Sequence, residues 1–190
     1  MRVIGGEARG RRLTAPAGRA VRPTSDRVRE ALFSSLSEVI PGAVVLDCYA
    51  GSGAVGIEAL SRGAAAAVLV EQDRRVADVA ASNVRSVGMT SRMQLHRTDA
   101  VRFCRQPTGG PFDVVFFDPP YTVPLADLYD RVTDLRSAGA LAAGARVVIE
   151  RGKHDPGLDA EPPAFLAFER RRSYGDTVLI SFTYDESVPR

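Results

Sequence analysis

Short apolar segments alternate with longer amphipathic segments along most of the 190-residue chain. The apolar segments have the length of buried strands, and the amphipathic segments repeat their apolar side chains with the 3.6-residue period of a helix. This alternation predicts an α/β fold with a mostly parallel sheet and helices on both faces. Strands are expected at residues 44–47, 66–71, 93–96, 112–117 and 146–150, with one helix ending near residue 63 and others at 73–87, 99–105 and 124–137.

The two ends of the chain depart from this alternation. A helix is expected before the first strand, because Thr24 and Ser25 are favourable capping residues for the amphipathic segment that follows. Two strand-like runs at 165–172 and 177–184 are joined by a short polar turn, which predicts an antiparallel hairpin. The chain is therefore predicted to form a doubly wound, seven-stranded, mostly parallel sheet that ends in an antiparallel pair. The apolar face of the first helix comprises Val28, Leu32, Leu36 and Val39.

Length and composition exclude several classes of protein. With 190 residues, 45% of them hydrophobic and 25% charged, the chain can bury one core without disulfides or metal and is not a disordered polymer. No apolar run approaches the roughly 18–20 residues that cross a membrane, and the amino terminus lacks an apolar signal segment. Cys48 and Cys104 are too few for a disulfide framework, and no metal-ligand spacing surrounds them. We expect a soluble, cytoplasmic, monomeric protein without a metal site.

A strong charge asymmetry underlies the net charge of +2. Residues 1–29 contain eight arginines but only Glu7 and Asp26 as acids, whereas the rest of the chain carries a net negative charge. A basic arm on a mildly acidic body is typical of a protein that binds a polyanion such as nucleic acid. We therefore expect a basic arm over residues 1–22, followed by one compact domain over residues 23–190.

Chemically informative residues follow the expected strands, where ligands bind in open α/β sheets. Asp47 ends the first strand and precedes the turn Gly51-Ser52-Gly53, whose backbone can approach a ligand closely. Glu71 ends the second strand, 20 residues after Gly51, where a carboxylate can accept hydrogen bonds from ribose hydroxyls. Because Asp47 would repel a pyrophosphate, the pattern favours an adenosine-type ligand with a cationic end over a dinucleotide.

The motif Asp118-Pro119-Pro120-Tyr121 follows the most apolar of the expected strands. The prolines restrict the backbone and contribute carbonyl groups without N–H donors, and Asp118 adds carboxylate oxygens. A planar group with an exocyclic amine fits this set, because its two N–H groups can donate to Asp118 and the Pro119 carbonyl while Tyr121 stacks on the ring. These three residues are therefore the candidate catalytic residues of a reaction at an amine nitrogen.

Two groups of motifs are similar to known families. Residues 47–53 together with 118–121 resemble the S-adenosylmethionine-dependent amino-methyltransferases. A more specific likeness, to bacterial methyltransferases that modify guanine N2 in 16S ribosomal RNA, covers essentially the whole chain. The pair Cys48-Tyr49 replaces one that is often Leu-Phe in that family, and it is still expected to line the cofactor pocket. The more specific likeness rests on residues 1–6, 9–11, 22–30, 58–64 and 174–175.

The resemblance implies a class I methyltransferase fold, S-adenosylmethionine as cofactor, and one guanine of the small-subunit RNA as target. It implies that the methionine end of the cofactor lies over Gly51–Gly53 near Asp47. Glu71 would then bind the ribose hydroxyls, and Asp99 would bind the adenine amine. The implied cofactor-binding residues are Asp47, Tyr49, Ala50, Gly51, Gly53, Glu71, Gln72, Asp99 and Ala100, with Thr24 and Arg27 closing the pocket from the side of the arm.

The arm is expected to contact the RNA. Residues 2–6 and 10–14 are predicted to pair as a hairpin that presents arginines to phosphates. The partner that the resemblance implies is 16S ribosomal RNA in an assembled or partly assembled small subunit. The candidate RNA-binding residues are Arg2, Arg9, Arg11, Arg12, Arg19 and Arg22.

Other functions remain compatible with these residues. The chemistry of residues 118–121 would also serve a DNA adenine-N6 or cytosine-N4 methyltransferase, although no segment is left to recognise a DNA sequence. A non-catalytic RNA-binding module is a further alternative, which the intact motifs at Gly51–Gly53 and 118–121 disfavour. A nicotinamide-dependent dehydrogenase is disfavoured because no acid–base pair is evident.

Overall fold

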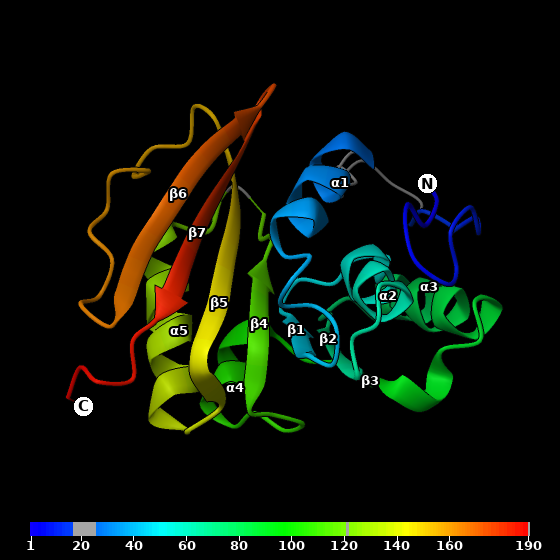
Figure 1. Ribbon diagram of the computed structural model, residues 1–190, viewed down its shortest axis with the longest axis horizontal. Helices are drawn as coiled ribbons and strands as arrows, with labels where there is room; N and C mark the ends of the chain where they lie inside the picture. The colour runs from blue at the N-terminus through cyan, green and yellow to red at the C-terminus, as the bar shows by residue number, and fades with distance from the viewer. Residues whose placement is uncertain (17–25, 121, 190) are drawn as a thin grey trace.

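A seven-stranded sheet with helices on both faces forms the centre of the protein (Figure 1). The computed structural model describes residues 1–16, 26–120 and 122–189. The strand order is β3-β2-β1-β4-β5-β7-β6; the first five strands pair in parallel, whereas β7 is antiparallel to both β5 and β6. The predicted fold class is therefore confirmed. The strands are β1 (Val44–Asp47), β2 (Ala66–Val70), β3 (Met93–His96), β4 (Phe112–Phe117), β5 (Leu141–Gly152), β6 (Leu166–Tyr174) and β7 (Thr177–Tyr184).

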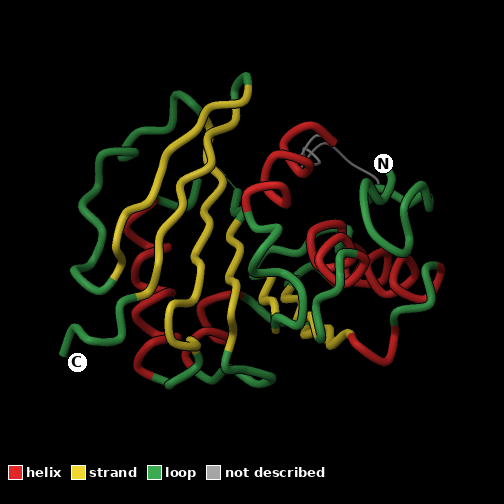
Figure 2. The backbone as a smooth tube through the Cα atoms, viewed as in Figure 1, coloured by secondary structure: helices red, strands yellow, loops and turns green. Residues whose placement is uncertain are grey.

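The helices divide between the two faces of the sheet (Figures 1 and 2). Apolar residues of α4 and α5 pack into one core, and apolar residues of α1, α2 and α3 pack into a second core on the opposite face. This division is the doubly wound arrangement that the alternation of strands and helices predicts. The helices are α1 (Asp26–Ser35), α2 (Ala54–Ser61), α3 (Arg74–Ser86), α4 (Ala100–Arg105) and α5 (Leu125–Ser137), with a short 3-10 helix, η1 (Thr90–Arg92), before β3.

Side chains alternate between the two cores along each central strand. In β1, Val45 belongs to the core beneath α1–α3, whereas Leu46 belongs to the core beneath α4 and α5. In β4, Phe116 and Phe117 divide in the same way. Successive side chains of a strand point to opposite faces of the sheet. The alternation therefore also predicts the face toward which the side chain directly after each strand points.

Two elements differ from their predicted extent by more than two residues. Strand β5 begins at Leu141 instead of residue 146, because the pairing with β4 continues across a register shift between Phe112 and Val114. The alanines and glycine at 142–144 are poor strand formers, so the sequence alone did not indicate this extension. Helix α1 ends at Ser35, before the predicted Leu36 and Val39, and the capping positions Thr24 and Ser25 lie outside the described residues.

The N-terminal segment, residues 1–16, forms a short paired loop instead of a regular hairpin. Its two halves meet in one antiparallel bridge, between Arg2 and Arg12. The amide of Val3 donates to the carbonyl of Arg11 at 3.0 Å, so the two predicted segments do lie side by side. The predicted boundary after residue 22 lies outside the described part of the chain.

The pairing is short because the arm directs its backbone groups at α2. The amides of residues 4 and 5 donate to the carboxylate of Glu58 at 2.7 and 2.8 Å, so they are not available for a strand ladder. Gly6 has a φ of +76°, and a Cβ there would lie 1.7 Å from the carbonyl oxygen of Ser61. Only glycine therefore permits the arm to approach α2 this closely.

The arm also completes the core on this face of the sheet. Val3, Ala8 and Leu13 are buried among residues of α1, α2 and α3. Asn83 of α3 accepts a hydrogen bond from the amide of Thr14 at 2.8 Å and donates to its carbonyl at 2.9 Å. Contacts on both sides of the exposed tip at residues 9–12 therefore hold the N-terminal segment against the sheet domain. Within the described ranges, none of the helices has the length and apolar character needed to cross a membrane.

Candidate active site

Three carboxylates lie at the carboxyl ends of adjacent strands. Asp47 is the last residue of β1, and Glu71 and Asp118 directly follow β2 and β4. Each is one residue beyond a core residue that faces α4 and α5, so strand alternation directs all three toward the face covered by α1–α3. The charges of Asp118 and Glu71 both raise the pKa of Asp47, as expected for carboxylates at the ends of adjacent strands.

The turn between β1 and α2 lies against the carboxyl end of β2. Gly51 and Gly53 have φ values of 53° and 78°, in the left-handed region that favours glycine. The amide of Ala50 donates to the carbonyl of Val70 at 2.9 Å, and that of Gly53 donates to the carbonyl of Ala50 at 2.7 Å. A Cβ at Gly53 would also lie 2.9 Å from the side chain of Leu69, so the turn is pressed against β2.

Asp47 is a buried acid whose carboxylate makes no hydrogen bond of normal geometry with the described residues. It is 1% exposed, and both of its carboxylate oxygens lack a partner among the described residues. Burial, followed by the charge of Asp118, raises the pKa of Asp47 to about 7, although the nearby amides of Gly56 and Tyr49 oppose the shift. Such a group is stabilised in its charged form when a cation binds beside it. The site therefore suits a ligand with an ammonium or sulfonium centre.

Glu71 is held in place by two backbone amides. Its carboxylate accepts from the N–H of Gly51 at 3.0 Å and from that of Asp73 at 2.8 Å. Burial raises its pKa, while the same two amides oppose the shift. Each carboxylate oxygen has further lone pairs, so the oriented group can still accept hydrogen bonds from a diol. Gln72, the next predicted residue, is exposed.

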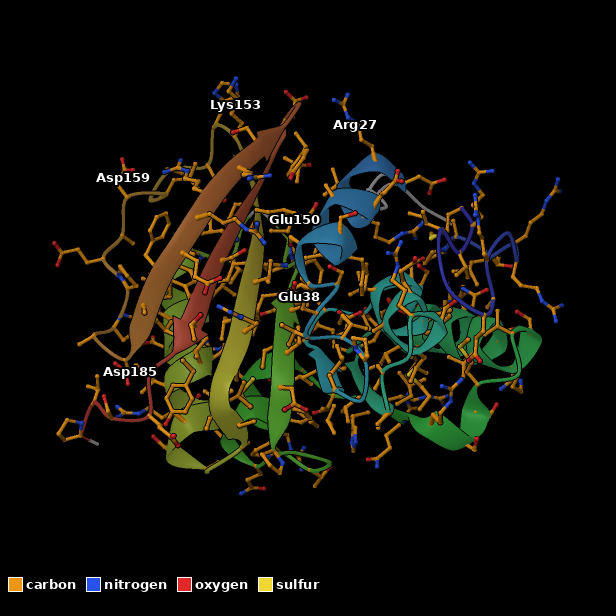
Figure 3. The ribbon with its side chains drawn as sticks, in the orientation of Figure 1. Arg27, Glu38, Glu150, Lys153, Asp159 and Asp185 are labelled. Carbon is orange, nitrogen blue, oxygen red and sulfur yellow. The ribbon has the colours of Figure 1, made fainter. Side chains whose placement is uncertain are left out.

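The remaining predicted cofactor residues differ in their surroundings. Tyr49 is half-buried, with its ring centroid 6.4 Å from that of Phe117, and burial raises its pKa to about 12. Ala100 is buried in the core near the ends of β1 and β2. Asp99 is exposed, and its carboxylate accepts from the amide of Arg102 at 2.8 Å as the N-cap of α4. Arg27 extends from the first turn of α1 away from the sheet (Figure 3).

The residues after β4 form the candidate site for the target nucleobase. Asp118 is half-buried and Pro119 is buried, directly beyond the buried end of β4. The carbonyl of Pro120 accepts from the amide of Val123 at 3.0 Å and so closes the turn before α5. Tyr121 and Thr24, two further predicted site residues, lie outside the described residues.

The described arginines of the predicted RNA-binding arm are all exposed. Arg2 lies 3.4 Å from the carboxylate of Asp26, and no such ion pair is found for Arg9, Arg11 or Arg12 among the described residues. The other two predicted RNA-binding arginines, at positions 19 and 22, lie outside the described part of the chain. Three exposed arginines on a docked loop provide a basic surface whose position is set by the fold.

Comparisons with known proteins agree with this geometry. A model of the protein family described as "Conserved hypothetical protein 95" matches residues 1–183. This chain belongs to that family. A relative from Escherichia coli (strain K12), "Ribosomal RNA small subunit methyltransferase D", is 43% identical over 150 residues, or 79% of this chain and 74% of the relative. The protein of the same name from Haemophilus influenzae is 36% identical over 163 residues, or 85% and 83% of the two chains.

Solved structures show the same fold as this member of the family. The Escherichia coli protein yhhF is 37% identical and superposes with a TM-score of 0.85, covering 97% of this chain and 98% of that one. An RNA methyltransferase from Salinibacter ruber, solved with S-adenosyl-L-homocysteine, is 20% identical with a TM-score of 0.63, and it covers 88% and 97%. The second likeness concerns the fold alone. Both agree with the predicted class I methyltransferase fold.

Two buried charges of this family member were not anticipated from the sequence. Arg29 and Glu58 are both fully buried, on α1 and α2. Arg29 donates to the carbonyl of Arg2 at 2.6 Å and to Asp26 at 2.8 Å, so it anchors the start of the arm, while Glu58 anchors residues 4 and 5. Burial lowers the pKa of Arg29, and the charge of Glu58 opposes this shift. The sequence did contain a signal for the burial of Arg29. This residue lies three residues before Leu32 and four before Phe33, which places it on the apolar face of its helix.

Among the described residues, no group of three or more His, Cys, Asp or Glu is arranged to hold a metal ion. The two cysteines, Cys48 and Cys104, are buried and free, with their sulfur atoms 3.9 Å apart.

Proposed function

We propose that this protein transfers a methyl group from S-adenosylmethionine to the exocyclic N2 of a guanine in 16S ribosomal RNA of the small ribosomal subunit. The observation that carries the proposal is that Asp118, which precedes the buried Pro119, follows β4 at the same end of the sheet as Asp47 and Glu71 at the ends of β1 and β2. The family supports it, because several relatives carry the name of a small-subunit ribosomal RNA methyltransferase. The choice of guanine and of N2 follows from the motif resemblance and is the part that needs testing.

The residues of the site fit the cofactor. The orphaned carboxylate of Asp47 suits the positive end of S-adenosylmethionine, and Glu71 is oriented to accept from its ribose hydroxyls. The bends at Gly51 and Gly53 allow the backbone to lie close to the methionine portion. When bound, S-adenosylmethionine supplies a methyl group on a positively charged sulfur. In this proposal Tyr49, Ala50, Gln72, Asp99, Ala100, Thr24 and Arg27 are the other residues of the cofactor pocket.

The acceptors after β4 fit the target amine. The lone pair of guanine N2 is delocalised into the ring, which makes the nitrogen a weak nucleophile. Hydrogen bonds from its two N–H groups to Asp118 and to the carbonyl of Pro119 would orient the amine and favour a tetrahedral nitrogen. Tyr121 would stack on the base. No strong base is required, because the methylated ammonium loses its proton readily to water.

The arm is proposed to bind the RNA backbone. The exposed guanidinium groups of Arg9, Arg11 and Arg12 can pair with phosphates and position the target nucleotide, as can Arg2, Arg19 and Arg22. The base must leave its stack to reach the edge of the sheet, and phosphate contacts on both sides of it would favour that state. The proposed partner is the assembled or partly assembled subunit in the cytoplasm, with the enzyme as a monomer.

One experiment tests the reaction, the cofactor and the target atom together. Small ribosomal subunits lacking the modification are incubated with the enzyme and methyl-labelled S-adenosylmethionine, and the RNA is digested to nucleosides. Label in N2-methylguanosine is the expected result. Label in methyladenosine or methylcytidine would retain amine methylation but contradict the choice of guanine. No label in subunits shown to be unmodified would contradict the ribosomal substrate and favour DNA methylation or a binding module.

A further inference from the structure

A fourth carboxylate lies beside the proposed base site. Glu150 is near the carboxyl end of β5 and is only 6% exposed. Phe117 of β4 pairs with Ile149 of β5, so Asp118 and Glu150 each come one residue after the same registered pair. Neighbouring strands are about 4.8 Å apart, which brings the two residues to adjacent positions at the edge of the sheet.

Glu150 also points to the same face as the other site carboxylates. Val148 belongs to the core beneath α1–α3 and Ile149 to the opposite core, so Glu150 is directed toward the first face. Figure 3 shows it on the side of β5 that faces α1. The next residue, Arg151, lies on the opposite face and forms an ion pair with Asp155. The proposed base site is therefore bordered by two carboxylates, Asp118 and Glu150.

The adjacent N1–H and N2 amine groups of guanine are both hydrogen-bond donors, which two neighbouring carboxylates can accept. Guanine carries an N1–H donor directly beside its N2 amine, whereas the ring nitrogen beside the exocyclic amine of adenine or cytosine is an acceptor. An ionised carboxylate can only accept, so it pairs with the first kind of edge and opposes a lone pair on the second. A single acid next to the amine-binding residues could thus select the base.

We propose that Glu150 accepts a hydrogen bond from N1–H of the target guanine and is a specificity-determining residue of the reaction. This inference rests on the proposed function, because it assigns Glu150 to the guanine whose N2 is bound by Asp118 and Pro119. The desolvation of Glu150 strengthens the selection, since a buried carboxylate facing an unpaired acceptor has no water to relieve the conflict.

The test changes one hydrogen-bonding atom of the base, N1, from donor to acceptor, and one atom of residue 150 from acceptor to donor. Small subunits are reconstituted with RNA that carries either guanine or 2-aminopurine at the methylated position; 2-aminopurine keeps the N2 amine but presents a lone pair at N1. Wild-type enzyme and Glu150→Gln are compared by kcat/KM on both substrates. The amide of glutamine can donate to the N1 lone pair, so the preference for guanine over 2-aminopurine should fall about 10- to 100-fold in the variant. The exposed Glu161→Gln is the matched control and should keep the wild-type preference.

The outcomes separate this inference from the function on which it rests. If wild-type enzyme places no methyl group on guanine N2, the proposed function fails. If it does so, but Glu150→Gln slows both substrates equally and keeps the wild-type preference, Glu150 has only a structural role and the inference is overturned. Should Glu150→Gln not fold, as judged by thermal unfolding and S-adenosylhomocysteine binding, Glu150→Asp replaces it. That variant should lose about tenfold in kcat/KM on guanine yet still reject 2-aminopurine, and wild-type activity on guanine would overturn the inference.

Discussion

The backbone amide of Gly51 donates a hydrogen bond to the carboxylate of Glu71, with 3.0 Å between nitrogen and oxygen. The contact joins the turn after β1 to the end of β2 and so unites two halves of the proposed cofactor pocket. A second amide, that of Asp73, fixes the other carboxylate oxygen at 2.8 Å. The orientation of Glu71 is therefore set before any ligand binds.

Replacing Glu71 should weaken cofactor binding. Glu71→Ala removes the acceptor for the ribose hydroxyls and leaves the amide of Gly51 without its partner, so the affinity for S-adenosylhomocysteine should fall about 10- to 100-fold. Isothermal titration calorimetry measures the loss. Glu71→Gln keeps an acceptor without the charge and should give an intermediate value. An unchanged affinity in the alanine variant would show that Glu71 does not contact the cofactor.

Cofactor affinity should depend on the ionisation of Asp47. Its pKa is raised to about 7 from an ordinary value of 3.8, and a cationic ligand favours the ionised form. The affinity for S-adenosylhomocysteine, which carries an ammonium group, should therefore increase about tenfold between pH 6 and pH 8. Titration calorimetry across this range measures the change.

Asp47→Asn provides the control for this pH dependence. The variant should bind more weakly at pH 8 and lose most of the dependence. Protein stability should show the opposite trend, because an acid whose pKa is raised on folding loses stabilisation as the pH rises from about 4 through about 7. A wild-type affinity that stays flat from pH 6 to pH 8 would show that the ligand does not interact with the Asp47 charge.

Asp118 should affect the chemical step more than cofactor binding. Asp118→Ala removes one of the two acceptors proposed for the target amine, so kcat on small subunits should fall about 100-fold or more. The affinity for S-adenosylhomocysteine should change by a smaller factor. Single-turnover methylation and calorimetry separate the two quantities. Equal losses in both would instead make Asp118 a cofactor residue.

Removing exposed arginines of the arm should weaken RNA recognition alone. Arg11→Ala/Arg12→Ala should raise KM for small subunits about tenfold and reduce the slope of affinity against salt concentration by about two. Binding of S-adenosylhomocysteine should stay unchanged. The matched control removes two exposed arginines of α4, on the opposite face of the sheet, as Arg102→Ala/Arg105→Ala. An equal effect in both double variants would indicate general electrostatic attraction, with no specific role for the arm.

Glu58 should contribute to folding through its contacts with the arm. Glu58→Gln removes the negative charge that accepts from residues 4 and 5, and it also removes one of the two carboxylates, Glu58 and Asp26, that offset the buried charge of Arg29. The free energy of unfolding should decrease by about 3 kcal/mol, as measured by urea denaturation. Glu30→Gln, at an exposed position of α1, should change it by less than about 0.5 kcal/mol. A decrease in Glu58→Gln no larger than this control would contradict the anchoring role.

Much of the fold was predictable because strands and helices have distinct local patterns. The segments that became β1, β2, β3 and β4 were located within a residue or so, since all four are bounded by turn residues and β1, β2 and β4 are buried on both faces. The extension of β5 back to Leu141 was missed, because only its pairing with β4 holds alanine and glycine in a strand. Helix α1 ended earlier than its periodicity suggested, at Ser35, although Leu36 and Ile40 still enter the core.

The pattern of apolar segments is enough to indicate which residues end the strands, and therefore which side chains gather at the carboxyl ends of the sheet. Asp47, Glu71 and Asp118 are identified in this way, because the carboxyl ends of parallel strands meet whatever the details of packing. Contacts between distant segments, in contrast, follow only from the folded arrangement. The docking of the arm on Glu58 and the adjacency of Glu150 to Asp118 depend on strand register and helix packing. Neither relationship leaves a periodic signal in the chain, since both join residues whose separation in sequence bears no relation to their separation in space.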